Sequence, residues 1–343
     1  MTKSETCLRV CSKILKPNYI TKLKRKTNLC ISVQEVLKVQ SKFLPISSNN
    51  NGTGGICQQD LEELCVLGRG NYGVVYKVRH RSTSEIYAMK VIQEDIMMNS
   101  TALNPNTSQE IEILTGSDSP FLTKCYGVFD RKVGEKAIVM EYMEAGTVET
   151  LLRNHGPFPE YVLGHIAHQV LNGLSYLHAR NIAHLDIKPA NLLVNKDLKV
   201  KISDFGISKI VDKDADCDFL GSQGTYAYMS PERLDSGTFG LGFPFAGDVW
   251  SLGVSLLELC VGHFPFFQAD QKPNMVEIVM KVCYGELDEF LPEKASEEFL
   301  SFFRCCLEKD PSKRWSSSQL LTHPFICMDR DPIPCNLLDS LIS

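Results

Sequence analysis

The sequence predicts an α+β fold in two lobes, a small β-rich lobe followed by a larger and mostly helical lobe. Between about residues 61 and 143, short runs rich in Val, Ile and Tyr are separated by turn residues, which is typical of strands. From Glu149 onward, apolar residues recur every three or four positions, which is typical of helices that bury one face. The chain has 343 residues, enough for a sizeable core. A junction between lobes is a favoured place for a pocket.

The β-rich lobe is predicted to hold several strands and one helix. The stretch LEELCVLGRGNYGVVYKVRH (61–80) predicts two strands around a glycine turn. The runs SEIYAMKVI (84–92) and KAIVMEYM (136–143) predict two more strands. Between them, SQEIEILTG (108–116) has helical spacing, with Ile111 and Leu114 on one face.

Three long apolar patterns predict buried helices in the second lobe. The stretch EYVLGHIAHQVLNGLSYLHA (160–179) carries one apolar stripe. The stretches DVWSLGVSLLELCVG (248–262) and SEEFLSFFRCCL (296–307) predict two further helices that contribute to the core. The stripe of the first helix consists of Val162, Ile166, Val170, Leu174 and Leu177.

The overall composition favours a globular protein without a nucleic-acid or membrane partner. Apolar residues make up 43% and charged residues 22% of the chain, and the formal net charge is only −5. The best candidate for a membrane span, WSLGVSLLELCVG (250–262), is short and contains Glu258. The first 16 residues lack the apolar core of a secretory signal. The 13 cysteines show no CxxC pair, so we expect reduced thiols in the cytosol or nucleus, most of them serving as small core residues.

Residues 1–60 differ in character from the rest and are predicted to form an N-terminal extension. A basic run, KLKRK (22–26), is followed by a short amphipathic stretch. The segment SSNNNGTGG (47–55) has the composition of a flexible linker. The sequence shows no internal repeat.

A glycine-rich turn is the first feature that points to chemistry. GRGNYGVV supplies Gly68, Gly70 and Gly73, and glycines allow the backbone to approach phosphate groups closely. A dinucleotide-binding site would require a helix directly after the glycines. Here a strand follows and then Lys90, which favours a hairpin that covers phosphates together with a lysine on the next strand.

Lys90 can neutralise nucleotide phosphates only if a carboxylate holds it in place. The predicted helix offers Glu110 and Glu112, which cannot share a face because they are two residues apart. Glu110 lies four residues before the apolar Leu114, on the same face. The sequence therefore favours Glu110 over Glu112 as the partner of Lys90.

A second cluster of polar residues suits magnesium and a catalytic carboxylate. HLDIKPANLL (184–193) contains Asp186 and Asn191, and DFG follows at residues 204–206. Mg²⁺ prefers hard oxygen ligands and retains several of its waters. Single Asp residues are usually solvated turn residues, but the ordered set of glycines, Lys90, Glu110 and these motifs argues for phosphoryl transfer.

Over about residues 61–325 the chain resembles the eukaryotic protein kinases, which implies the bilobal protein kinase fold and the use of ATP and Mg²⁺. The resemblance implies that Asp186 is the base for the substrate hydroxyl and that Lys188 contacts the γ-phosphate. It also implies that Asn191 and Asp204 are the metal ligands. The nucleotide-binding residues implied in the same way are Gly68, Arg69, Gly70, Gly73, Val75, Lys90, the gatekeeper Met140, and Glu141 and Met143 of the hinge. Structural roles are implied for Glu232 of SPE with its partner Arg314, and for Asp248, which supports the catalytic loop.

Longer motifs narrow the resemblance to one kinase family. HLDIKPANLLVN, GTYAYMSPERL, AGDVWSLGVSLLEL and CCLEKDPSKRWSSSQLLTHPF resemble the mitogen-activated protein (MAP) kinase kinases, particularly the plant type. In the N-terminal extension, KLKRKTNLCI (22–31) resembles the motif with which such kinases dock their MAP kinase. Its Lys and Arg residues would meet an acidic patch while Leu29 and Ile31 fill an apolar groove. Taken without the kinase domain, this run is more typical of a solvated or nuclear-targeting segment than of a docking motif.

The chain departs from the family pattern at two linked places. Leu185 stands where the family has the Arg that binds the phosphate of the activation segment. The two positions where plant relatives carry phosphorylatable residues are Ala215 and Gly221, neither of which accepts a phosphate, and Ser222 is shifted by one. The two departures are consistent with each other, because an Arg that binds a phosphate has no partner where no phosphate can form. The alternative is that Leu185 simply packs better.

These observations predict a kinase that uses ATP and Mg²⁺ to phosphorylate a MAP kinase, on Thr and Tyr of its activation loop, downstream of a MAP kinase kinase kinase. The alternative is a pseudokinase scaffold that docks MAP kinases without catalysis, although the complete catalytic set argues against it. A nucleotide-binding module other than a kinase does not explain Asp186, Asn191 and DFG together. We expect a cytoplasmic protein, with the nucleus as a second location, and a C-terminal tail at residues 326–343.

Overall fold

The computed structural model describes residues 56–70, 73–93, 105–132, 134–211, 224–240, 243–268, 271, 273–292 and 294–328. All of them belong to the second of two compact units of the chain, Gly55–Ser343. The predicted docking motif (22–31) and linker (47–55), residues 212–223 of the activation segment and most of the predicted tail lie outside the described residues.

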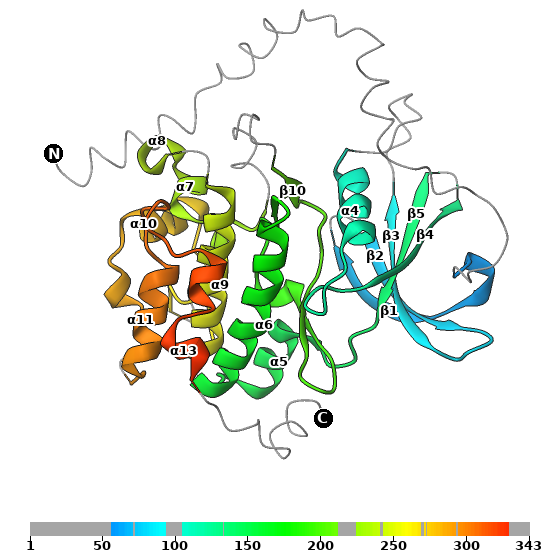
Figure 1. The fold of residues 1–343 in the computed structure, drawn as a ribbon, viewed down its shortest axis with the longest axis horizontal. Helices are drawn as coiled ribbons and strands as arrows, with labels where there is room; N and C mark the ends of the chain where they lie inside the picture. The colour runs from blue at the N-terminus through cyan, green and yellow to red at the C-terminus, as the bar shows by residue number, and fades with distance from the viewer. Residues whose placement is uncertain are drawn as a thin grey trace, which may run out of the picture. The chain divides into compact units, whose positions relative to one another are not determined.

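The first part of this unit is a five-stranded antiparallel sheet with one long helix (Figure 1). In the sheet the strands are ordered β1-β2-β3-β5-β4. The helix α4 contacts β4. The elements are the 3-10 helix η3 (Gln58–Asp60), β1 (Leu61–Gly70), β2 (Gly73–His80), β3 (Ile86–Gln93), α4 (Pro105–Gly116), β4 (Cys125–Lys132) and β5 (Glu135–Glu141).

The strand β4 is absent from the sequence-based prediction. Its sequence, CYGVFDRK, contains Gly127 and Asp130, two residue types that are depleted in strands. Its pairing with β5 is interrupted by irregular steps between Cys125 and Gly127 and between Asp130 and Lys132. This strand therefore exists because it pairs with β5, which follows it directly in the chain, and not because of its own sequence pattern.

Alternation along β3 directs Lys90 toward the ligand side of the sheet. Met89 and Val91 pack into one apolar cluster with Val78 and Val139. Because successive side chains of a strand point to opposite faces, Lys90 lies on the other face. The alternation of side chains along β3 thus places its core residues on one face of the sheet and Lys90 on the other.

The second part is mainly helical, with short strands between the helices (Figure 1). The helices are α5 (Val148–His155), α6 (Glu160–His178), α7 (Pro231–Leu234), α8 (Ser236–Phe239), α9 (Pro244–Val261), α10 (Met275–Tyr284), α11 (Glu297–Cys306), α12 (Ser317–Leu320) and α13 (Pro324–Cys327), with 3-10 turns η4 (Pro189–Asn191), η6 (Tyr226–Tyr228) and η7 (Leu287–Glu289). The last helix ends two residues beyond the domain end that the sequence predicts.

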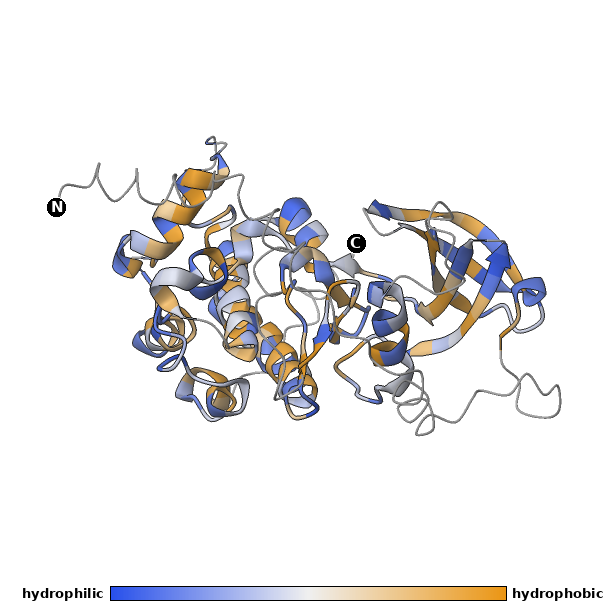
Figure 2. Cartoon of the chain, turned by 90° about the horizontal axis from the view of Figure 1, so that it is seen from above, coloured by the Kyte–Doolittle hydropathy of each residue, from blue (hydrophilic) through white to orange (hydrophobic). Residues whose placement is uncertain are grey.

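The helices α6 and α9 pack against each other at the centre of this lobe. Every member of the predicted apolar stripe of α6 is buried, as expected for a helix that faces the core. Figure 2 shows the helices of this lobe carrying hydrophobic residues beside hydrophilic ones. Within the described part of the chain, α9 is the one helix long and apolar enough to cross a membrane, and 72% of it is buried inside the domain.

Five short strands, which the sequence-based prediction lacks, frame the chemistry-bearing loops. They are β6 (Gly146–Thr147), β7 (Ile182–Ala183), β8 (Leu192–Val194), β9 (Val200–Ile202) and β10 (Lys209–Ile210). The segment with Asp186 runs from β7 to β8, and DFG lies between β9 and β10. Because β10 pairs with β7, the chain after DFG is held beside the beginning of the segment with Asp186.

The cysteines within the described residues are all free thiols. Cys306 is fully buried and Cys283 nearly so, and burial raises the pKa of Cys283 to about 12 and that of Cys260 to about 11. Such thiols behave as small apolar residues. The expectation of core cysteines fails for Cys57, Cys65 and Cys327, which are exposed.

The close contact between α9 and α11 depends on Gly253. A Cβ atom there would lie 2.8 Å from Cys306 Cβ and 2.9 Å from Leu307 Cδ2. We expect Gly253→Ala to lower the free energy of unfolding by about 1–3 kcal/mol relative to Gly116→Ala, a control in α4 with open space around it. Urea unfolding of the two variants measures the difference, and equal midpoints would contradict the packing argument.

Candidate active site

A cavity of about 760 Å³ lies between the sheet and the helical lobe. Its lining includes the strands on both sides of the glycine turn, β3, β5, the segment after β5 and the loops that carry Asp186 and Asp204. All the residues that the sequence predicts for nucleotide binding line it: Gly68, Arg69, Gly70, Gly73, Val75, Lys90, Met140, Glu141 and Met143. The structure therefore brings the predicted set together in one place.

Lys90 joins the helix α4 to the DFG motif across this cavity. Its Nζ donates to Glu110 Oε1 at 2.6 Å and to Asp204 Oδ1 at 2.8 Å. Glu110 is buried, whereas Glu112 is exposed. The helical spacing that selects Glu110 over Glu112 thus agrees with the geometry.

Burial and opposite charge compete at this ion pair. Burial opposes the charge of Lys90, but the carboxylates of Glu110 and Asp204 outweigh it and raise the pKa of Lys90. Burial likewise opposes the charge of Asp204, and Lys90 outweighs it and lowers the pKa of Asp204. Both groups are therefore charged at neutral pH, as required of a phosphate-binding cation and a metal-binding carboxylate.

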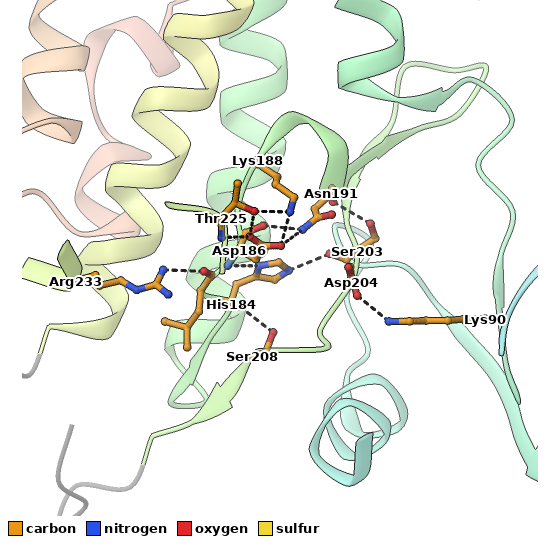
Figure 3. A network of polar contacts seen from close by, with 11 residues as sticks. Lys90, His184, Asp186, Lys188, Asn191, Ser203, Asp204, Ser208, Thr225 and Arg233 are labelled. Carbon is orange, nitrogen blue, oxygen red and sulfur yellow. Dashed lines mark hydrogen bonds and ion pairs between the residues drawn. The ribbon is translucent and has the colours of Figure 1, made fainter. Parts of the chain in front are cut away.

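Asp186 lies at the centre of a polar network beside the cavity (Figure 3). Its Oδ2 accepts from Lys188 Nζ at 2.7 Å and from Asn191 Nδ2 at 2.9 Å. Its Oδ1 accepts from the Thr225 hydroxyl at 2.9 Å and from the Thr225 N–H at 3.2 Å. Lys188 Nζ also donates to Thr225 Oγ1 at 2.7 Å. This carboxylate is therefore held on both oxygens by the catalytic loop and the end of the activation segment.

The backbone before Asp186 is anchored to α9. Asp248, fully buried, accepts from the N–H of His184 at 2.9 Å, from the N–H of Leu185 at 2.7 Å and from His178 Nε2 at 2.9 Å. Burial opposes the charge of Asp248, but His178 and His184 outweigh it and lower the pKa of Asp248. The supporting role that the kinase resemblance implies for Asp248 matches these contacts.

Leu185 packs its side chain away from the cavity. It is 4% exposed and forms a small apolar cluster with Ala183 and Ile207, against which Val211 and Phe245 pack. Members of this cluster come from β7, the segment after DFG and α9. Where an Arg would present a charge to a phosphate, this chain presents an apolar contact to the beginning of its own activation segment.

The segment after Thr225 is tied to the helical core. Tyr228 donates its hydroxyl to Glu258 Oε2 at 2.6 Å, and its carbonyl accepts from Ser251 Oγ at 2.7 Å. Arg314 Nη1 and Nη2 donate to Glu232 at 2.7 and 3.0 Å, the pairing that the resemblance implies. These contacts fix the 3-10 turn η6, which begins directly after Thr225.

The hinge residue Glu141 uses its side chain for a contact between strands rather than for a ligand. Its Oε2 accepts from Lys201 Nζ, on β9, at 2.6 Å. The sequence also does not single out Ala88 and Leu193 as lining residues. Ala88 lies two residues before Lys90 on β3, so the period of strand side chains could have indicated it. Leu193 lies on β8, after the turn that holds Asn191, and no local period indicates it.

The protein kinase domain model matches residues 61–326. The chain is 50% identical over 281 residues to mitogen-activated protein kinase kinase 9 of Arabidopsis thaliana, which covers 81% of this chain and 88% of the relative. It is 47% identical to mitogen-activated protein kinase kinase 7 of the same plant, over 83% of this chain and 89% of the relative. Identity to the tobacco mitogen-activated protein kinase kinase SIPKK is 38%, over 80% of this chain and 76% of the relative. The chain therefore belongs to the plant MAP kinase kinases, a family of protein kinases that act in MAP kinase cascades.

Proposed function

We propose that the protein transfers the γ-phosphoryl group of ATP, bound with Mg²⁺, to hydroxyl groups on the activation loop of a MAP kinase. One observation carries this proposal. The carboxylate of Asp186 and the Lys90–Asp204 pair line the same cavity, with the strands of the glycine turn above them. A base, a phosphate-binding cation and a metal-binding carboxylate are thus assembled around one space.

The residues of this cavity fit a nucleotide with a divalent cation. Asp204 keeps 37% of its side chain exposed while it binds Lys90. Asn191 uses its amide nitrogen toward Asp186, so the amide oxygen is the atom it offers to a cation. One carboxylate and one amide leave room for phosphate oxygens and waters, which is the ligand set that Mg²⁺ favours. The cation, when bound, neutralises charge that develops on the transferred group.

The chemical step follows from positioning and charge. The substrate oxygen attacks the γ-phosphorus, the bond to the ADP oxygen breaks, and the hydroxyl proton passes to Asp186. Lys188 supplies positive charge beside the transferred group, and Lys90 does so beside the remaining phosphates. Because these groups are fixed before the substrate arrives, little reorganisation accompanies the step.

The same proposal extends to the substrate, the activator and the location. We infer dual specificity for Thr and Tyr from the family, since Lys188 alone argues only for hydroxyl substrates. An upstream MAP kinase kinase kinase and a cytoplasmic location, with the nucleus as a second one, complete the expectation.

The decisive experiment incubates purified protein and Mg-ATP with a panel of kinase-dead MAP kinases and maps the phosphorylated residues. Phosphate on Thr and Tyr of one activation loop supports the proposal. Binding of ATP and a MAP kinase without transfer would favour the scaffold alternative instead.

Docking through residues 22–31 gives a separate prediction. Replacing Lys24, Arg25, Leu29 and Ile31 together with Ala should weaken phosphorylation of a MAP kinase but leave activity toward a short generic peptide. The difference in rate between the variant and the unaltered protein should be smaller at high salt, because salt screens the charge contacts of the unaltered motif. Initial rates on the MAP kinase and on the peptide measure the effect. An equal loss of rate on both substrates would show that the segment supports the fold and does not dock the MAP kinase.

A further inference from the structure

The peptide of Leu185 is held in an unfavourable conformation by two buried charged groups. Its φ is +68°, in the left-handed region that costs a residue other than glycine about 1–2 kcal/mol. Asp248 Oδ1 accepts from its N–H at 2.7 Å, and Arg233 Nη1 donates to its carbonyl at 2.8 Å. Backbone strain persists only where the surroundings over-determine it. Here an anion holds one end of the residue and a cation holds the other.

Arg233 is a cation inside the protein. Only 7% of the residue is exposed, and burial lowers the pKa of its guanidinium against the opposing effect of Asp248 and Asp186. Taking a charge out of water costs several kcal/mol unless other charges offset it. Two of the carboxylates that offset it belong to the machinery around the catalytic loop. The neighbouring Glu232 is already bound by Arg314.

The guanidinium also meets the end of the activation segment. Gly224 has a φ of +116°, and a Cβ atom there would lie 3.1 Å from the Leu185 carbonyl oxygen and 3.2 Å from Arg233 Nη2. The next residue is Thr225, which donates twice to Asp186. Arg233 therefore lies where the segment carrying Asp186 and the segment carrying Thr225 come together.

We propose that Arg233 is a positioning residue for phosphoryl transfer, which fixes Asp186 by holding the Leu185 carbonyl beside Gly224. The inference rests on the proposed function. Because residue 185 is Leu and not Arg, it places no positive charge beside the carboxylate of Asp186. Arg233 brings positive charge to the Leu185 carbonyl, next to Asp186, and it acts through the backbone rather than by touching a substrate (Figure 3).

The test compares Arg233→Gln, which removes the charge and keeps a planar donor, with Arg233→Lys, which keeps the charge on a smaller group. Arg153→Gln is the matched control, because Arg153 is exposed on α5 and pairs only at the surface with Glu149. Two readouts are taken on the full chain. The first is kcat and the KM for ATP with a kinase-dead MAP kinase, and the second is hydrogen exchange of the peptide that spans residues 182–193.

We expect Arg233→Gln to lower kcat about tenfold, which corresponds to about 1.4 kcal/mol. The KM for ATP should change less than twofold, because Lys90 and the glycine strands are untouched. Exchange in residues 182–193 should rise while exchange in α6 stays the same. Arg233→Lys should give an intermediate kcat, and Arg153→Gln should match the unaltered protein.

Several outcomes would overturn the inference. Unchanged kcat per folded molecule with a lowered melting temperature would show that Arg233 only stabilises α7. Unchanged exchange in residues 182–193 would show that the loop is held without it. If Arg233→Gln does not fold, Arg233→Lys decides by the same two readouts. If the unaltered protein transfers no phosphate, the proposed function fails, and the exchange measurement alone decides the role of Arg233.

Discussion

The Asp186→Asn variant is expected to transfer phosphate to a MAP kinase about 10²–10⁴-fold more slowly than the unaltered protein while remaining folded. An amide of the same shape cannot accept the hydroxyl proton. The amide also places an NH₂ group where the unaltered protein has a carboxylate oxygen that accepts hydrogen bonds. Depending on its orientation, this group faces the donors Lys188 and Asn191 or the donor Thr225. The initial rate with Mg-ATP and a kinase-dead MAP kinase measures the loss, and thermal unfolding reports the fold.

The matched control is Asp197→Asn, which makes the same change at an exposed residue between β8 and β9. It should keep the full rate. Lys90→Met should reproduce the loss by a different route, because it removes the cation that joins Glu110 and Asp204. A rate for Asp186→Asn within a few-fold of the control would remove Asp186 from the role of base.

Much of this site could be predicted because its residues follow local rules in a fixed order. A helical period of 3.6 places Glu110, and not Glu112, on the face of the apolar Leu114, and Glu110 is the residue that binds Lys90. The buried stripe of α6 follows from the same period. Long periodic segments carry enough repeats for a pattern to stand out from chance.

Other features depend on pairing and packing that no local period shows. The strands β6 to β10 have only two or three residues each, too few to show a period. The strand β4 contains Gly127 and Asp130 and exists because β5 pairs with it. Arg233 lies within the motif GTYAYMSPERL, but the motif assigns it no role, and its contact with Leu185, 48 residues earlier, arises only where α7 meets that residue.

The second large effect concerns how this kinase is switched, and the structure supplies a physical basis for it. In a usual switch, a phosphate gains one to three charge-assisted hydrogen bonds from arginines, each contributing about 1.5–3 kcal/mol. Shifting an equilibrium from 1:99 to 99:1 requires about 5.5 kcal/mol. In this chain the position of that Arg is occupied by Leu185, which lies in an apolar cluster and cannot bind a phosphate. We expect contacts within the chain to support the activation segment instead, such as those of Thr225 with Asp186 and of Lys209 with Asn106 on α4.

We therefore expect basal activity that an active upstream kinase raises less than tenfold. Leu185→Met, an apolar change of similar volume, should leave this behaviour unchanged. Leu185→Arg alone should gain little, because it places a charge among Ala183 and Ile207 without a phosphate to bind. The acidic residues 214, 216 and 218 should not replace that phosphate, since a carboxylate has less charge and fewer acceptor oxygens.

Leu185→Arg combined with Ala215→Ser and Gly221→Ser should restore dependence on an activator by tenfold or more, about 1.4 kcal/mol. The triple variant returns both the cation and the groups that can be phosphorylated, so that each now has a partner. The measurement is the initial rate on a kinase-dead MAP kinase before and after treatment with an active upstream kinase. A tenfold rise in the unaltered protein that disappears in Ser222→Ala would refute the argument, because the switch would then have moved by one residue rather than been lost. Absence of that rise, together with its appearance in the triple variant, would show that packing at residue 185 has replaced a phosphate as the support of the activation segment.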